Sequence, residues 1–127
     1  MSKVVLDASA MMAVVNDEVG SDEVLPYLKQ GVMSAVNFSE AIHCLNRIAI
    51  PTPEARQIIK DLLVEIMPYD EEQACLTAEF KLMTKKKGLS LGDCACLALA
   101  KRLNVSVVTA DKVWSQLDLK VKVILLR

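Results

Sequence analysis

Residues 88–111 read GLSLGDCACLALAKRLNVSVVTAD, and this stretch decides the fold. From Leu91 to Leu103 it is apolar on nearly every side, which predicts a helix buried on most of its faces. Val105–Val108 is a short β-branched run, typical of a strand. Asp93 lies at the start of the helix, and Asp111 follows the strand. A buried helix that leads directly into a buried strand predicts an α/β fold.

The same alternation continues along the rest of the chain. Four further apolar runs are predicted strands: Lys3–Leu6, Val32–Val36, Ile66–Pro68 and Val121–Leu125. Further segments are predicted helices: Ser9–Asn16, Asp22–Gln30, an amphipathic stripe from Phe38 to Ala49, Glu54 to about Glu65, Glu71–Lys87 and a short helix after Asp111. Because the strands are apolar runs rather than strict alternations, we expect a mostly parallel sheet with both faces covered. Pro68 indicates an edge strand.

Length and composition narrow the class of protein. The 127 residues fit one domain, 1–127, and the net charge of −1 lacks the basic footprint of a tight, nonspecific nucleic-acid binder. The N-terminus has no secretory leader, and no apolar run reaches the roughly 18 residues of a membrane span. We therefore expect a cytoplasmic protein without a membrane segment. The cysteines form no C-x-x-C motif and lie in apolar helical stretches, which predicts buried thiols: Cys44, Cys75, Cys94 and Cys96.

Acidic residues occur where predicted strands end and helices begin. Asp7 closes the first strand, Glu40 follows the second, and Asp111 follows the Val105–Val108 strand. Asp93 opens the apolar helix. Right-handed crossovers bring the carboxyl ends of parallel strands to one edge of the sheet, where the sites of such folds lie. We therefore expect the four acids to meet at that edge.

Four clustered carboxylates repel one another, and some would take up protons unless a cation compensated them. No arginine or lysine in these segments is placed to neutralise them. A hard divalent cation such as Mg²⁺ or Mn²⁺ prefers carboxylate and water oxygens as ligands. Such an ion can activate water and stabilise charge on a phosphoryl oxygen. The sequence therefore predicts a divalent-metal site.

Each acid also fits a purely structural role. Asn37-x-x-Glu40 and Ser90-x-x-Asp93 have the spacing of a capping box. Asp7 and Asp111 fit simple N-caps. Taken singly, each acid favours capping, whereas their shared location favours a site.

The other motifs and residues considered do not indicate a catalytic or nucleotide-binding site. The chain contains neither G-x-x-x-x-G-K-[ST] nor G-x-G-x-x-G, so nucleotide binding of those kinds has no support. His43 is the sole histidine and lies on a predicted outward helix face, so no nucleophile–histidine system is built around it. Lys85–Lys87 precede Gly88 and fit a helix end. Trp114 is predicted to anchor the last helix by packing.

Four motifs together match a known family. They are Val4-Val5-Leu6-Asp7-Ala8-Ser9, Val36-Asn37-Phe38-Ser39-Glu40-Ala41, Leu89-Ser90-Leu91-Gly92-Asp93-Cys94 and Val108-Thr109-Ala110-Asp111. In this order, over nearly the whole chain, they resemble the PIN domain family and within it the small VapC-like toxins.

The resemblance implies a three-layer α/β/α sandwich with a central, mostly parallel sheet. It implies an endoribonuclease that needs Mg²⁺ or Mn²⁺ and uses metal-activated water, most simply the toxin of a type II toxin–antitoxin pair. The residues that match the family's catalytic and metal-binding acids are Asp7, Glu40, Asp93 and Asp111. Ser9 and Thr109 match polar positions that orient the acids. The resemblance also implies a homodimer, a cognate antitoxin partner and an RNA substrate.

Several alternatives stay open on the sequence. A PIN-type nuclease in RNA maturation would carry the same acids. A receiver-type or phosphatase-type α/β domain would suit the length, although Asp7 is followed by Ala8 and Ser9 rather than by a second acid. A non-catalytic binding domain would use the acids as caps only. The RNA substrate and the number of metal ions are not specified by the sequence.

Overall fold

A computed structural model describes residues 3–17, 21–62, 65–117 and 120–126. The strands are β1 (Val4–Leu6), β2 (Gly31–Ser34), β3 (Glu65–Met67), β4 (Ser106–Thr109) and β5 (Val123–Leu125). The α-helices are α1 (Ala8–Val15), α2 (Ser21–Leu28), α3 (Ala35–Asn46), α4 (Thr52–Leu62), α5 (Glu71–Met83) and α6 (Leu91–Leu103). Two short 3₁₀ helices are η1 (Lys85–Lys87) and η2 (Lys112–Gln116).

The five strands form one parallel sheet in the order β3-β2-β1-β4-β5. Val5 of β1 pairs with Val32 of β2 on one side and with Val107 of β4 on the other. From β1 the chain builds outward to β3, and it then returns to add β4 and β5 on the opposite side. The winding direction therefore reverses between β1 and β4, the position at which doubly wound sheets bind ligands.

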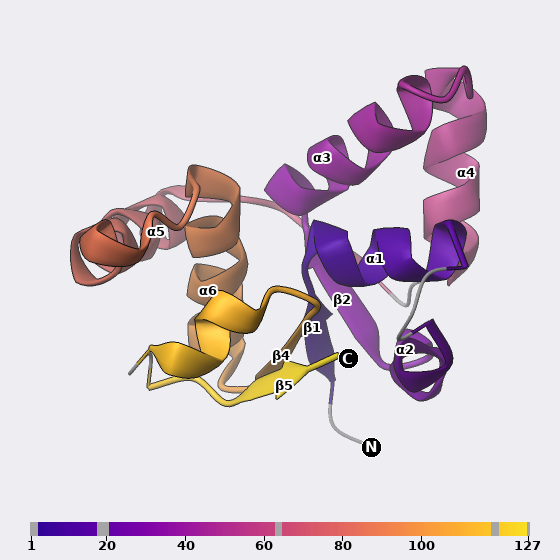
Figure 1. Cartoon of the computed structure of the whole chain (residues 1–127). Helices are drawn as coiled ribbons and strands as arrows, with labels where there is room; N and C mark the ends of the chain where they lie inside the picture. Colours follow the sequence, from indigo (N-terminus) through magenta and orange to yellow (C-terminus); the bar gives the residue numbers. More distant parts are fainter. Residues whose placement is uncertain (1–2, 18–20, 63–64, 118–119, 127) are drawn as a thin grey trace.

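Helices cover both faces of the sheet and make three layers (Figure 1). On one face, α1 to α4 pack with alternate strand residues such as Leu6 and Val108. On the other face, α5, α6 and η2 enclose Val5 and Val107. Trp114 of η2 is fully buried in that second core, as predicted. The expected three-layer α/β/α fold with a parallel sheet is thus confirmed, and β3 lies at an edge as Pro68 predicted.

Several local boundaries differ from the sequence prediction. The second strand ends at Ser34 instead of Val36, because the Ser34 hydroxyl accepts a hydrogen bond from the Val36 N–H (3.2 Å) and starts α3 there. The helix predicted to reach Lys87 ends at Met83, and η1 follows it up to Gly88, which has φ 68°. The helix predicted to end near Glu65 does not include that residue, because Glu65 begins β3. Residues 63–64 lie outside the described residues.

The prediction of four buried thiols is wrong in part. Cys94 and Cys96 are buried, but Cys75 is exposed and Cys44 is only partly buried. Cys75 lies on the outer side of α5, which packs mainly against α6 and leaves that side to solvent. His43 is exposed, in agreement with its predicted outward face. Within the part of the chain that the structure describes, none of the helices has the length and apolar character needed to cross a bilayer.

Candidate functional site

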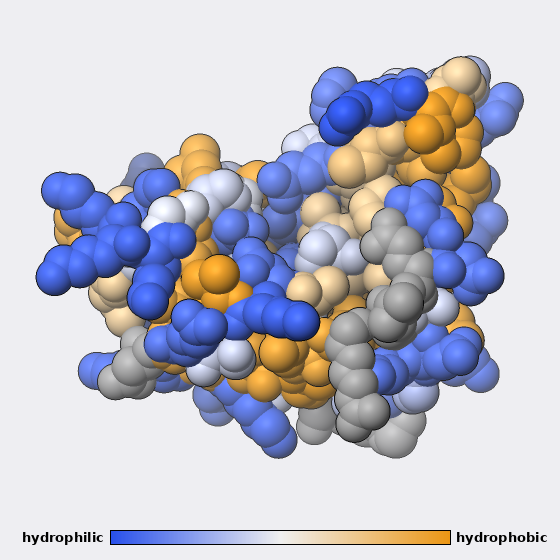
Figure 2. Space-filling model, viewed as in Figure 1, coloured by the Kyte–Doolittle hydropathy of each residue, from blue (hydrophilic) through white to orange (hydrophobic). Residues whose placement is uncertain are grey.

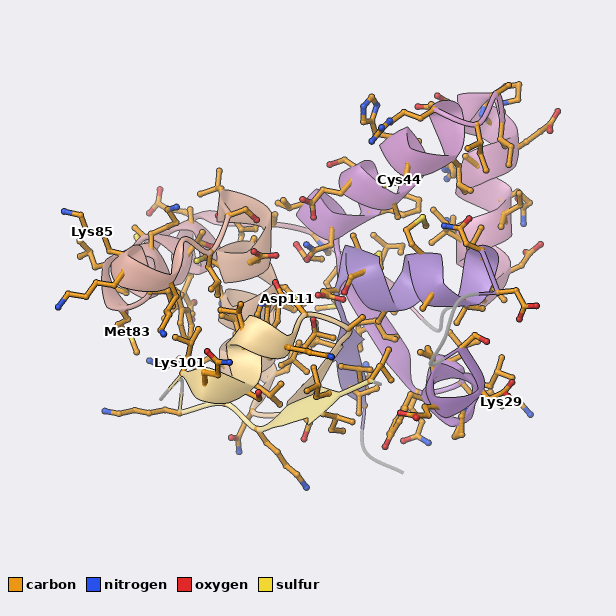
Figure 3. The ribbon with its side chains drawn as sticks, viewed as in Figure 1. Lys29, Cys44, Met83, Lys85, Lys101 and Asp111 are labelled. Carbon is orange, nitrogen blue, oxygen red and sulfur yellow. The ribbon has the colours of Figure 1, made fainter. Side chains whose placement is uncertain are left out.

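The carboxyl ends of β1 and β4 bring two distant segments together. Asp7 follows β1, and Thr109 ends β4, 102 positions later. This is the point where the winding direction reverses, and in open parallel sheets ligands bind in the crevice at such a point. Figure 2 shows a hollow in the surface between the part formed by α5 and α6 and the part formed by α3 and α4. Asp111, labelled in Figure 3, lies between these two sides.

Asp7 is held by hydrogen bonds to both carboxylate oxygens. The Ser9 hydroxyl (2.7 Å) and the Ala10 N–H (2.8 Å) donate to Oδ1. The Thr109 hydroxyl donates to Oδ2 at 2.6 Å. The side chain therefore caps α1, as one alternative predicted, yet the Thr109 bond from another strand goes beyond what a cap requires.

Burial makes the charge of Asp7 costly. The residue is only 4% exposed, and burial raises the pKa of its carboxyl to about 6. The hydrogen bonds from Thr109, Ala10 and Ser9 oppose this rise, while the negative charge of Asp93 adds to it. Among the residues that the structure describes, no lysine or arginine forms an ion pair with Asp7. A buried carboxylate is unfavourable when it has no cationic partner, so binding a cation beside it would be favourable.

Asp111 is joined to Asp7 through Thr109. The Asp111 N–H donates to Thr109 Oγ1 (3.0 Å), and the same hydroxyl donates to Asp7. Ser9 closes the network, because its Oγ accepts from the Ala110 N–H at 3.1 Å. Asp111 Oδ1 accepts from the Val113 N–H (3.0 Å) and caps η2. Ser9 and Thr109 thus fix the positions of two of the predicted acids.

Glu40 reaches the site from α3 and lies against the first turn of α6. The Asn37 amide donates to Glu40 Oε1 at 2.8 Å and to the Gly92 carbonyl at 3.0 Å. The Asn37–Glu40 capping box predicted from spacing is wrong, because Ser34 is the N-cap and Asn37 lies inside the helix. Glu40 is therefore free of a capping role and is directed towards α6 instead.

Asp93 caps α6 in the way its spacing predicted. Its Oδ2 accepts from the Ser90 N–H (2.9 Å), and the Ser90 hydroxyl accepts from the Asp93 N–H (3.1 Å). Only one carboxylate oxygen is used in this capping box. Asp93 follows Gly92, the residue of α6 against which the Glu40 carboxylate lies, so both acids belong to the region around the first turn of α6.

Three of the four acids act electrostatically on one buried thiol, that of Cys96. Burial raises the pKa of the Cys96 thiol well above its ordinary value, and the negative charges of Asp7, Asp93 and Glu40 raise it further. Each of these carboxylates therefore lies within electrostatic reach of the same atom. Asp111 joins the group through Thr109 rather than through Cys96.

The donor chemistry suits a divalent cation, although the present side-chain positions do not chelate one. In residues 3–17, 21–62, 65–117 and 120–126, no three His, Cys, Asp or Glu side chains are grouped closely enough to hold a metal ion. The side chains proposed as ligands are all carboxylates, which favour hard ions such as Mg²⁺ and Mn²⁺. The buried, uncompensated Asp7 and its neighbouring negative charges supply a field that favours such an ion.

Two residues close to the candidate acids, Gly92 and Cys96, were not predicted from the sequence to belong to the site. Gly92 was quoted only within a motif, and Cys96 only as a buried thiol. Gly92 is a glycine inside a helix without a turn to explain it, and this is the signal that could have singled it out. Cys96 carried no such signal, because alternating Cys and Ala also fits an ordinary helix core.

A profile of the PIN domain family matches residues 4–120. This range covers most of the 127 residues, so the chain belongs to the PIN domain family. A comparison with curated protein sequences finds no match.

Solved structures share the fold over nearly their whole length. A chain of a toxin–antitoxin complex from Klebsiella pneumoniae has a TM-score of 0.74 at 15% identity, with 96% of each chain covered. A chain of DNA-bound VapBC from Salmonella typhimurium has a TM-score of 0.71 at 16% identity, with 98% of each covered. VapC20 of Mycobacterium tuberculosis, a Sarcin-Ricin loop cleaving toxin, has a TM-score of 0.72 at 14% identity, covering 90% of this chain and 94% of that one. At such identities the likeness establishes the fold, while activity must be argued from the site.

Proposed function

We propose that the protein is a divalent-metal-dependent endoribonuclease. The observation that carries this proposal is the buried Asp7 carboxylate at the winding reversal of the sheet, with a pKa raised to about 6 and no partner cation among the described residues. Membership of the PIN domain family supports it independently. Asp7, Glu40, Asp93 and Asp111 are the proposed ligands and catalytic acids, and Mg²⁺ or Mn²⁺ is the proposed ion.

The residues of the candidate site have different proposed roles. Asp7 and Asp111 are fixed relative to each other by Thr109, and Ser9 holds the second edge of the Asp7 carboxylate. Glu40 of α3 and Asp93 of α6 are the further proposed ligands, and their charges act on the same buried thiol, Cys96, as the charge of Asp7 does. When bound, the ion would polarise a phosphoryl oxygen and lower the pKa of a water ligand. The carboxylates would also hold that water in place and accept its proton.

The toxin role is part of the proposal. The fold neighbours include a toxin–antitoxin complex and a toxin that cleaves the Sarcin-Ricin loop, and the chain spans them almost end to end. We therefore infer a cognate antitoxin as partner, a homodimer as the assembled form, a cytoplasmic location and RNA as the substrate.

The other candidate functions have less support. A receiver or aspartyl phosphatase would place a second acid close after Asp7, whereas Ser9 occupies that region and donates to Asp7. A purely structural use of the acids accounts for Asp93 and Asp111 but not for Glu40, which caps no helix. A role in RNA maturation uses the same chemistry and differs only in the RNA that is cut.

The test is cleavage of a labelled panel of tRNA, ribosomal RNA fragments and messenger RNA with Mg²⁺, Mn²⁺ or EDTA. Asp7→Asn is compared with Asp61→Asn, which changes an exposed acid on α4 that accepts a hydrogen bond from Gln57 Nε2 of its own helix (2.6 Å). We expect metal-dependent products from wild type and from Asp61→Asn, and none from Asp7→Asn. Equal cleavage by the folded Asp7→Asn protein would refute the proposal.

A further inference from the structure

Asn37 forms a bridge between two helices that carry proposed metal ligands. It is 1% exposed, and its Nδ2 donates to Glu40 Oε1 on its own helix and to the carbonyl of Gly92 on α6, 55 positions away. Both of these neighbours are acceptors, so the amide nitrogen must face them. The amide Oδ1 has no hydrogen-bond partner within the described part of the chain.

Gly92 leaves the space that the Glu40 carboxylate occupies. A Cβ atom at position 92 would overlap Glu40 Oε2 and would lie 2.7 Å from both Glu40 Cδ and Glu40 Oε1. These distances are below any normal contact, so a larger residue would displace the carboxylate. The backbone does not need glycine there, because Gly92 lies in α6 and Gly88 is the glycine with positive φ. Since glycine weakens a helix relative to alanine, the benefit of Gly92 lies in the space it provides.

We propose that Asn37 and Gly92 are positioning residues that hold the Glu40 carboxylate against the first turn of α6, beside Asp93. The inference rests on the proposed metal site and adds the residues that bring its two helix-borne acids together. Asn37 supplies a neutral donor. A lysine or arginine in its place would also fix Glu40, but it would cancel the negative charge that a divalent ion requires.

The alternative is that Asn37 and Gly92 merely pack α3 against α6. Packing alone predicts that substitutions lower stability and leave the metal affinity of the folded protein unchanged. Positioning predicts a loss of metal affinity that depends on Glu40. Residues that orient metal ligands typically contribute 10–100-fold to metal affinity.

Two variants test positioning with matched controls. Asn37→Leu keeps the approximate size of the side chain, adds no charge and removes the donor to both acceptors. Its control is Asn46→Leu on the same helix, where Nδ2 donates to the Ile50 carbonyl (2.9 Å) and to Thr52 Oγ1 (3.3 Å). The control for Gly92→Ala is Gly88→Ala. Gly88 has a left-handed backbone conformation, so alanine is strained there, but its Cβ atom would contact nothing within 4 Å.

The measurement is Mn²⁺ affinity by calorimetry on folded, full-length protein. We expect Asn37→Leu and Gly92→Ala each to weaken Mn²⁺ binding by about 10–100-fold, while both controls match wild type. In a Glu40→Gln background, Gly92→Ala is expected to cause no further loss. Wild-type Mn²⁺ affinity in both folded variants would overturn the inference.

A second measurement separates this inference from the proposed function. In metal-free protein, Gly92→Ala is expected to change the stability to urea less favourably in wild type than in a Glu40→Ala background, which has room for the new methyl group. If wild type binds no Mn²⁺, the metal-site proposal fails on its own. If instead Gly92→Ala changes the free energy of unfolding equally in the two backgrounds, Glu40 does not lie against Gly92 and the positioning inference is wrong.

Discussion

Replacing Asp7 by Asn is expected to stabilise the metal-free protein at neutral pH. The pKa of the buried carboxyl is about 6 in place of the ordinary 3.8, a rise of about two pH units. Each unit corresponds to about 1.4 kcal/mol, so the ionised carboxylate lowers the free energy of unfolding by about 3 kcal/mol. Asn resembles the protonated acid, and its Oδ1 can still accept from Ser9 and Ala10.

The pH dependence has a definite sign. Because the pKa is higher in the folded state, the folded protein binds the proton more tightly than the unfolded chain does. The stability linked to that proton is fully present below pH 3.8 and is lost as pH rises through about 6. Asp7→Asn lacks this titration. The variant should therefore exceed wild type by about 3 kcal/mol at pH 8 and by about half as much at pH 5.

Urea unfolding of wild type, Asp7→Asn and Asp61→Asn at pH 5 and pH 8, in EDTA, measures these differences. Adding Mn²⁺ should then stabilise wild type and not Asp7→Asn, by about 2.7 kcal/mol at 100 times the dissociation constant. The reasoning is refuted if Asp7→Asn is less stable than wild type at pH 8, or if the difference between them does not change with pH.

Three further substitutions test contacts around the site by urea unfolding. Thr109→Val removes the hydroxyl that donates to Asp7 and accepts from Asp111, and the unpaired buried groups should lower stability by about 1–3 kcal/mol; an unchanged midpoint would contradict that network. Ser90→Ala removes the N-cap of α6 and should cost about 1 kcal/mol, whereas Ser90→Thr keeps the cap and serves as its control. Trp114→Ala should cost about 3–5 kcal/mol, because the ring is fully buried in the core under η2. Trp114→Phe should cost much less, since the indole N–H has no partner among the described residues, and a loss equal to that of Ala would contradict this.

Much of the site could be predicted because strand direction determines it. Apolar runs ended by Asp7 and Asp111 indicate parallel strands, and parallel strands place such ends at one edge of a sheet. The capping box of Ser90 and Asp93 was also readable, since it depends on residues three positions apart. These features need no knowledge of how distant elements approach one another.

The relation of Glu40 to α6 could not be predicted in this way. Spacing allows either Ser34 or Asn37 to cap α3, and the choice depends on where β2 ends. The contact between Glu40 and Gly92 depends on the approach of α3 to α6, which no local pattern encodes. Glu40 itself is only partly buried, and its carboxylate lies against Gly92 rather than within the core.

The measurement that tests the central claim most directly is anomalous diffraction from crystals of the protein soaked in Mn²⁺. We predict an anomalous peak at the carboxyl ends of β1 and β4, coordinated by Asp7 together with acids from α3 or α6. The same soak of Asp7→Asn crystals should show no peak there. A well-diffracting Mn²⁺-soaked wild-type crystal without a peak at that edge would contradict the claim that these acids form a metal site.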